Sequence, residues 1–399
     1  MPNSSSGLQA TPERGVINNY QYTIVAGSFS VAWMLISALG FLGNLINIQT
    51  FIAMRLEDGV TVSFLVLSVT DLCFTLTMFL RATASIFYAI EMATQYAVWF
   101  WVDPYTMYIF FANFCIVLYI MTVLTTTFLA VARCMCVVRP LHFRNSFTRS
   151  RCILILAGFA VFTILSYLPI LANMAIVRQF DRRTNTSRPM LWTSTSRELV
   201  KDIVWGARDT FLPASTQVIV IVCVFVMASS LRESSKFRQS STCLSVIDRT
   251  DTSRNKDTVI NQTSKENQDT LPTTYASSAT MNALPRTNDT STKSKDANKL
   301  TRKDVQVVKQ VALISFVYIV CNMPKIMVNI AGIIEPDLTI NKRLHNMYLV
   351  SVSLTEIFQL FNSSINVYIY YTYNTKFRSC CLLGKSYCAT CCQLEKVVE

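Results

Sequence analysis

The chain has 399 residues, of which 51% are hydrophobic and 15% are charged, and its formal net charge is +12. Soluble domains contain about 25% charged residues, so this composition argues against a set of soluble domains. The excess of positive charge fits a surface that faces anionic lipid or an acidic protein, and it requires no nucleic acid.

Seven segments are long and apolar enough to cross a bilayer, which takes about 20 mostly apolar residues. Four uncharged runs qualify outright, and three further segments qualify with one or two interior charges. The predicted fold class is therefore an all-α membrane protein, a seven-helix bundle at 23–378 that ends in a short amphipathic eighth helix. The spans are expected at about 23–54, 60–88, 104–136, 152–177, 204–231, 304–334 and 344–373.

The basic residues of the short loops predict the orientation, because Lys and Arg are favoured on the cytoplasmic side. The loop 138–152 contains four arginines and no acidic residue, and the tail after the last span also begins with basic residues. With an odd number of spans, residues 1–22 are then extracellular. The loop 178–203 is basic as well and disagrees with this assignment. We expect a multi-pass plasma-membrane protein with an extracellular N-terminus.

Several residues are candidates for covalent modification. Asn3 and Asn185 begin glycosylation sequons on the predicted outside. Residues 379–399 form a Cys-rich tail, in which Cys380 and Cys381 lie beside basic residues and are candidate palmitoylation sites. Inert thiols or a zinc site are the alternatives for this tail. No cysteine lies in a predicted extracellular segment, so we expect no outer disulfide.

Residues 232–303 are rich in Ser, Thr, Asn, Asp and Lys and poor in aromatic residues. Such a composition cannot bury a core, so the segment is predicted to be a disordered cytoplasmic loop. Its hydroxyl groups are candidate targets of kinases. A passive linker is the alternative.

Polar residues interrupt several spans, and inside a bilayer such residues are costly and usually functional. We expect a polar cluster formed by Asn44, Asp71, Thr122, Asn362, Ser363 and Asn366. Asp71, Thr122, Asn362, Ser363 and Asn366 are the candidate ligands of a sodium ion, or else the cluster takes up a proton. A hydrogen-bonded structural plug is the alternative, and no organic cofactor is expected.

Six short motifs, each in the appropriate span, resemble those of the rhodopsin-like (class A) G-protein-coupled receptors. They are GFLGN, LSVTD, ARCMCVVRPL, FLP, YIVCNMP and NVYIY, which resemble GxxGN, LAxAD, DRYxxxxxPL, the helix-five proline, FxxCWxP and NPxxY. The resemblance covers about residues 25–385 apart from the long loop. It implies a receptor that binds an extracellular ligand and activates a heterotrimeric G protein, with kinases and arrestin as partners of the loop 232–303. LEDGVTVSFL resembles invertebrate, particularly molluscan, chemosensory receptors.

The resemblance also implies a set of switch and coupling residues: Arg133, Pro140, Leu141, Asp304, Asn366 and Tyr370. Ala132 stands where the family has an acidic residue before the helix-three arginine. We therefore expect Arg133 to pair with Asp304 instead, and the alternative is that Arg133 extends to lipid phosphate.

Other positions depart from the family pattern. Asn322 replaces the helix-six tryptophan, and Val367 replaces the helix-seven proline. Tyr108 stands where the resemblance places the helix-three cysteine of an outer disulfide, and its partner cysteine in the second outer loop is missing too. These changes indicate a divergent lineage.

The family's ligand pockets are tested by position. Cys115 stands where aminergic receptors have a carboxylate, and Leu360 stands where opsins have the retinal-bearing lysine, so both ligand classes are disfavoured. The outer half holds five candidate ligand-binding residues, namely Arg81, Cys115, Asp209, Lys325 and Glu356. Lys325 and Glu356 are expected to face one another, either as a structural salt bridge or in a cavity for a short peptide or a chemosensory cue.

A transporter or channel and an enzyme are the two other classes of protein to compare with a receptor. A seven-helix transporter or channel without G-protein coupling is the alternative function, although the sequence shows neither inverted repeats nor filter residues. An enzyme is not expected, because the two histidines, His142 and His345, lie in predicted loops and no catalytic set is evident.

Overall fold

The computed structural model describes residues 17–54, 56, 58–139, 143, 147–230, 232, 302–339 and 342–381. Asn3, Pro140, Leu141, the loop expected at 232–303 apart from its first residue and backbone at 302–303, and the tail from 382 onward lie outside the described residues.

The described chain is mostly helical, and six of its helices are long and apolar enough to cross a membrane. Five of these are α1 (Asn19–Ala53), α2 (Gly59–Ala93), α3 (Pro104–Val138), α5 (Arg149–Leu171) and α8 (Arg302–Ile334). The sixth, Trp205–Ser230, follows the short α6 (Arg197–Val204) and begins as the π-helix η1 (Trp205–Phe211). A multi-pass membrane protein is the conclusion that these helices support.

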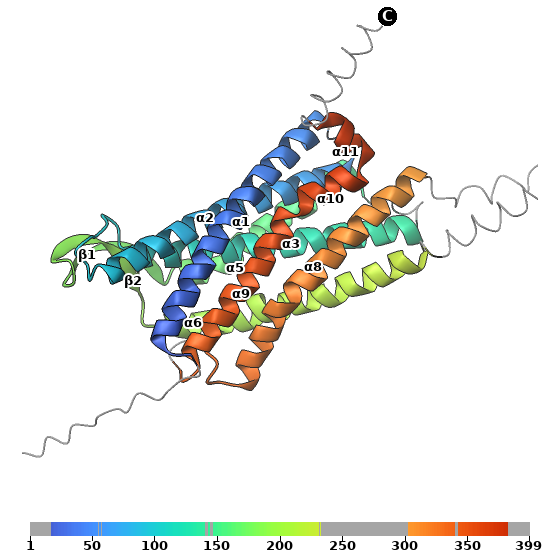
Figure 1. The fold of residues 1–399 in the computed structure, drawn as a ribbon. Coiled ribbons are helices and arrows are strands. Elements are labelled where there is room, and N and C mark those ends of the chain that lie inside the picture. Colours follow the sequence, from blue (N-terminus) through green and yellow to red (C-terminus); the bar gives the residue numbers. More distant parts are fainter. Residues whose placement is uncertain are drawn as a thin grey trace, which may run out of the picture. The chain divides into compact units, whose positions relative to one another are not determined.

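The last expected span consists of two consecutive helices, α9 (His345–Ser364) and α10 (Asn366–Tyr373), which are separated at Ile365. The six-residue α11 (Thr375–Cys380) follows directly. α9 packs against α1 and α8, so that these three helices lie side by side (Figure 1).

Local sequence explains where several helices begin. Asn18 and Gln21 form a reciprocal capping box at the start of α1. The side chains of Asp58 and Asp103 accept hydrogen bonds from the backbone three residues later, at 2.6 and 2.9 Å. Pro104 occupies the first position of α3, where its missing N–H costs no hydrogen bond.

The two glycines of GFLGN allow α1 to approach its neighbours closely. A Cβ at Gly40 would lie 2.2 Å from Ser364 Oγ and 2.8 Å from Thr75 Cγ2, both too short for a real contact. A Cβ at Gly43 would lie 3.0 Å from Val367 Cγ1. The motif therefore lets α1 pack tightly against α2 and the junction of α9 and α10.

An aromatic cluster fixes α11 to the bundle. The ring of Phe51 in α1 lies 5.0 Å from that of Tyr370 and 5.2 Å from that of Phe377 in α11. All three side chains are fully buried, and Phe64 of α2 stacks on Phe51. Edge-to-face contacts of this kind add to the burial of large apolar surfaces.

A β-hairpin was not expected from the sequence. β1 (Met174–Asp181) pairs antiparallel with β2 (Thr186–Thr193), and the fourth span ends at Leu171 rather than at 177. The prediction was wrong here because residues 174–177 are apolar, and apolarity alone does not distinguish the end of a helix from the start of a strand.

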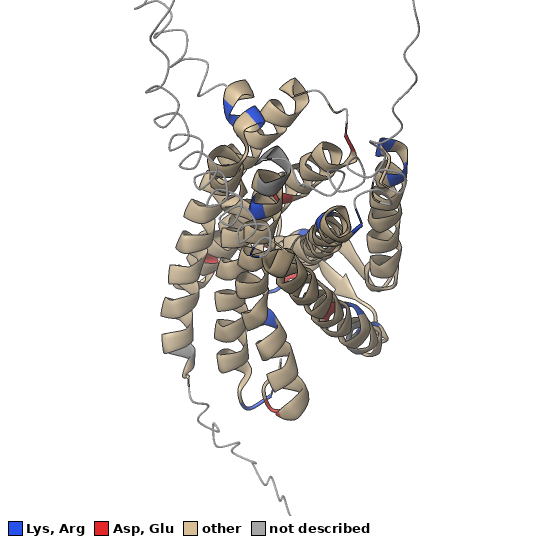
Figure 2. Cartoon of the chain, turned by 90° about the vertical axis from the view of Figure 1, so that its right-hand side faces the viewer, with Lys and Arg blue, Asp and Glu red and all other residues tan. Residues whose placement is uncertain are grey.

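Charged side chains are sparse along the helices, as Figure 2 shows. Many large apolar side chains of the spans are exposed instead, for example Leu39 at 70% and Leu154 at 73%. Soluble proteins rarely expose apolar surface over whole helices, whereas lipid-facing helices do.

Candidate functional site

The polar residues expected to cluster in the middle of the bundle do lie together. The buried carboxylate of Asp71 in α2 accepts hydrogen bonds from Asn366 Nδ2 at 2.8 Å and from Thr122 Oγ1 at 3.3 Å. Asn44 of α1 donates to the backbone oxygen of Ser363 at 2.9 Å. These three bonds connect α1, α2, α3, α9 and α10 through buried atoms.

A small cavity adjoins this cluster, and Thr122, Asn362 and Ser363 are among its lining residues. Its free space is about 10 Å³, close to that of one water molecule. A single carboxylate with neutral oxygen donors suits a hard cation that carries one charge. Among the described residues, no group of three or more His, Cys, Asp or Glu could hold a metal ion, so sodium at Asp71 stays a prediction.

Sodium is expected to stabilise the protein through Asp71. At ten times its Kd, an ion bound only by the folded state adds about 1.4 kcal/mol, which corresponds to a rise in Tm of roughly 2–6 °C. Thermal unfolding of the purified protein in sodium chloride, compared with equal choline chloride, measures this rise. Asp71→Asn should abolish the difference between the two salts. A difference that persists in the variant would place the ion elsewhere.

Nearer the C-terminal end of α2, Arg81 forms a buried ion pair with Glu356 of α9. Its Nη1 lies 2.6 Å from Glu356 Oε1, and its Nη2 donates to the Tyr108 hydroxyl at 2.7 Å. The guanidinium also lies over the rings of Trp33 and Tyr108, 5.0 and 4.6 Å from their centroids. Aromatic faces attract a cation, and they suit the planar guanidinium in particular.

The expected contact between Lys325 and Glu356 is therefore corrected. Glu356 pairs with Arg81, whose forked guanidinium is already oriented by Tyr108. Lys325 Nζ instead lies 3.6 Å from the centroid of the Tyr119 ring. Within the described part of the chain, no hydrogen bond or ion pair of Lys325 is found within 4.0 Å.

Asp209 also forms an ion pair with an arginine, Arg208, and the geometry of the π-helix η1 makes this pair possible. Adjacent residues do not face each other on an α-helix. In η1, Arg208 Nε and Nη2 donate to the two carboxylate oxygens of Asp209 at 2.6 and 2.9 Å. The backbone oxygen of Asp209 accepts from Asn329 Nδ2 of α8 at 2.9 Å. A π-turn leaves backbone groups available for such contacts, and it is common at functional sites.

Asn322 of α8 is the centre of a buried group of hydrogen-bonded side chains. It accepts from the Tyr119 hydroxyl, and its Nδ2 lies 3.3 Å from both Gln217 Oε1 and the Tyr318 hydroxyl. The residue that stands where the resemblance has tryptophan thus links three helices. Cys115 is buried nearby in α3. Sequence analysis did not identify Tyr119 or Gln217, because nothing in the pattern separates them from other residues of the spans. Tyr318 begins the YIVCNMP motif, but no role was predicted for it.

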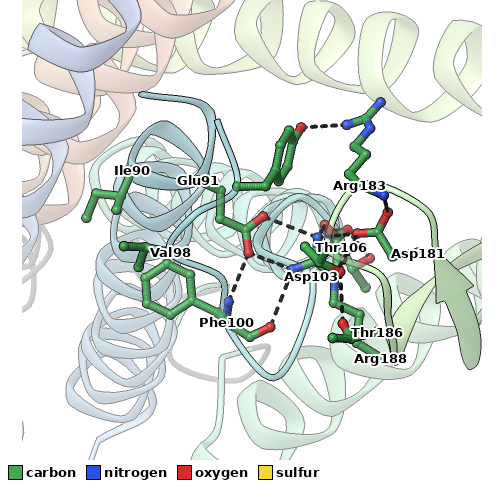
Figure 3. A network of polar contacts seen from close by, with 12 residues as sticks. Ile90, Glu91, Val98, Phe100, Asp103, Thr106, Asp181, Arg183, Thr186 and Arg188 are labelled. Atoms are coloured by element: carbon green, nitrogen blue, oxygen red, sulfur yellow. Dashed lines mark hydrogen bonds and ion pairs between the residues drawn. The ribbon is translucent and has the colours of Figure 1, made fainter. Parts of the chain in front are cut away.

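Sequence analysis also missed Arg188, which lies at the centre of a buried ionic network on the hairpin (Figure 3). Arg188 is 2% exposed, and its guanidinium lies 2.6 Å from Glu91, 2.7 Å from Asp181 and 3.3 Å from Asp103. These carboxylates come from α2, from β1 and from the residue before α3. The Arg188 network therefore joins three segments that are distant in the sequence.

Backbone hydrogen bonds complete the attachment of the hairpin to α3. The Asp103 amide donates to Pro189 O at 3.1 Å, and the Leu191 amide donates to Thr106 Oγ1 at 2.7 Å. The cysteines among the described residues are all free thiols. Asn185 lies exposed at the hairpin turn with φ 53°, so its sequon is accessible.

The Asp181 carboxyl has a pKa below its usual value. Burial raises its pKa, but the hydrogen bonds from the Arg183 amide and from the Arg188 guanidinium outweigh this effect. A carboxylate with a lowered pKa stabilises the fold above about pH 4 and loses this contribution as the pH falls through the lowered pKa.

The candidate switch and coupling residues are described in part. Arg133 lies in α3, and Tyr370 is fully buried in α10. Asp304 lies in α8, but its side chain is outside the described residues, so its pair with Arg133 stays a prediction. Cys380 is half-buried, and Cys381 is buried against the aromatic cluster of α11.

The site therefore has three parts. They are the Asp71 cluster in the middle of the bundle, the ion pairs Arg81–Glu356 and Arg208–Asp209 together with the separate residue Lys325, and the Arg188 network on the hairpin. A scan of the sequence against models of known protein families finds no match, and a search of curated proteins finds no significant match either.

Proposed function

We propose that the chain is a seven-helix receptor that binds an extracellular ligand and activates a heterotrimeric G protein. The observation that carries the proposal is the Asp71 cluster. Asp71, Asn366 and Asn44 belong to three separate motifs of the resemblance. Asn366 donates a buried hydrogen bond to Asp71, and Asn44 donates one to the backbone oxygen of Ser363, three residues before Asn366. A chance likeness of short motifs would not require their polar members to meet.

The proposal needs a seventh crossing, and α9 with α10 supplies it. Together they run from His345 to Tyr373, a length similar to that of the other spans. α9 packs against α1 and α8, both of which are apolar enough to cross a membrane. With seven crossings the N-terminus lies outside the plasma membrane, and the hairpin with Asn185 lies on the same side.

Signal transmission would use the contacts between helices that differ in two packings of the bundle. A ligand in the outer half alters the polar contacts around Lys325 and Asn322 on α8, next to Pro324 inside that helix. Proline removes a backbone hydrogen bond and gives α8 a point at which it bends. The cytoplasmic half of α8 then moves relative to Arg133 and exposes a surface for the G protein. A short peptide or a chemosensory cue is the proposed ligand.

The test is nucleotide exchange by purified G proteins in the presence of the full-length protein in lipid nanodiscs. At least one member of a library of short peptides and waterborne metabolites is expected to accelerate exchange on one G-protein class. Arg133→Ala should lose the acceleration but retain ligand binding. Ion flux or solute uptake into proteoliposomes, without exchange on any G-protein class, would instead establish the transporter or channel function.

A further inference from the structure

We propose that Lys325 binds an anionic group of the ligand, a carboxylate in particular. The inference rests on the proposed function, because it specifies the chemical class of the ligand that the proposed receptor binds. It follows from how the charges of the outer half are paired, which the sequence does not show.

Both carboxylates that approach this region are already occupied. Glu356 is paired with Arg81 at 2.6 Å, and Asp209 is held by Arg208 through two bonds of 2.6 and 2.9 Å. Each pair is electrically neutral and buried. Of the three cations inside the described spans here, Arg81 and Arg208 each have a direct carboxylate partner, and Lys325 has none within 4.0 Å.

The contact that Lys325 does make leaves its hydrogen-bond donors unused. Its Nζ lies 3.6 Å from the centroid of the Tyr119 ring, which attracts a cation but does not replace an oxygen acceptor. The Tyr119 hydroxyl itself is engaged with Asn322. An ammonium has three donors and no acceptor. A partner with oxygen acceptors would satisfy these donors and the charge together.

Lys325 is half-buried, whereas Arg81, Arg208 and Asp209 are buried. Part of its surface thus remains accessible. An unpaired charge in such a place is costly, so a functional reason for its presence is required. An anionic ligand group supplies the missing partner, and Tyr119 and Asn322 then lie beside the bound anion.

The experiment compares carboxylates with their neutral amides on the purified full-length protein in detergent, without G protein. The probes are acetate, benzoate and N-acetylglycine with the corresponding amides, at constant ionic strength, and the readout is Tm. At ten times its Kd, at least one acid should raise Tm by about 2–6 °C, whereas its amide should not. Lys325→Met should abolish the shift, and Lys325→Arg should retain it.

Lys342→Met is the matched control, because it removes the same charge from an exposed position before α9. It should leave the response to the carboxylate unchanged. The inference is overturned if none of the acids shifts Tm relative to its amide, or if Lys325→Met responds like the wild type. If the acid binds but no member of the ligand library accelerates nucleotide exchange in the separate G-protein assay, the proposed function fails while the anion site stands, so the two failures are distinguishable.

Discussion

Replacing Arg188 by methionine is expected to release the hairpin β1–β2 from the C-terminal end of α2 and the N-terminal end of α3. The substitution removes one cation and leaves the carboxylates of Glu91, Asp103 and Asp181 close together and buried. Breaking a buried ion pair by removing one partner costs about 3–5 kcal/mol, and here three carboxylates lose the same partner. Hydrogen exchange of the amides in 174–193 should therefore accelerate strongly.

Two controls sharpen this experiment. Arg178→Met changes an exposed arginine of the same hairpin and should leave the exchange unchanged. Arg188→Lys should restore only part of the protection, because an ammonium lacks the fork that reaches several carboxylates. The difference in Tm between the wild type and Arg188→Met should also shrink as the pH falls below about 4 and through the lowered pKa of Asp181. Unchanged exchange in Arg188→Met would show that the backbone bonds hold the hairpin alone.

This network has a consequence for the orientation of the chain. The loop 178–203 is basic, and by the distribution of Lys and Arg alone it would be placed in the cytoplasm. Two of its arginines form contacts within the structure. Arg188 forms ion pairs with three carboxylates, and Arg183 donates a hydrogen bond to the Tyr96 hydroxyl at 2.7 Å. Part of the positive charge of this loop is thus explained by folding and not by topology.

Sequence analysis located the Asp71 cluster because its members carry recognisable motifs. Asp71 is an acidic residue in an apolar span, and Asn366 lies in a polar stretch of another. Polar groups in apolar helices turn toward one another, since lipid offers no hydrogen bonds. The proximity of such residues can therefore be predicted from the sequence alone.

The pairing of the outer charges could not be predicted in the same way. Helical spacing indicates the depth of Arg81, Lys325 and Glu356, but it does not determine which helices are neighbours or which rotamers they adopt. The rings of Trp33 and Tyr108 also contact the Arg81 guanidinium, and helical spacing does not indicate these contacts either. For Arg188 the difficulty was greater, because it lies in a basic loop among other arginines and not in an apolar span, where a single charge stands out.

The last span contains one feature that the sequence predicted and one that it did not. Its expected range of 344–373 agrees with α9 and α10 taken together. Its break at Ile365 was not predicted, since the family's helix-seven proline is replaced by Val367 and no other breaker is present. The polar residues that it contributes to the interior also make it the least apolar of the spans, and it is not among the six helices that qualify by composition.

The Arg81–Glu356 pair provides the second large effect. Glu356→Gln is expected to destabilise the protein by about 3–5 kcal/mol, because it leaves the Arg81 guanidinium buried without a counter-charge. Arg81→Met should lower the stability by a similar amount, because it leaves the Glu356 carboxylate without its cation. The double variant Arg81→Met/Glu356→Met should be more stable than the sum of the single effects predicts, since it removes both charges at once.

Thermal unfolding of the single and double variants measures this coupling. The surface pair of Arg343 and Asp337 is the matched control, with its side chains 55% and 44% exposed and 3.3 Å apart. Asp337→Asn should change Tm little, because solvent screens an exposed pair. If the effects at Arg81 and Glu356 were additive, each charge would be stabilised by its other neighbours, and Glu356 would be free to serve the ligand. Strong coupling would instead assign Glu356 to the framework of the bundle and leave Lys325 as the charge that meets the ligand.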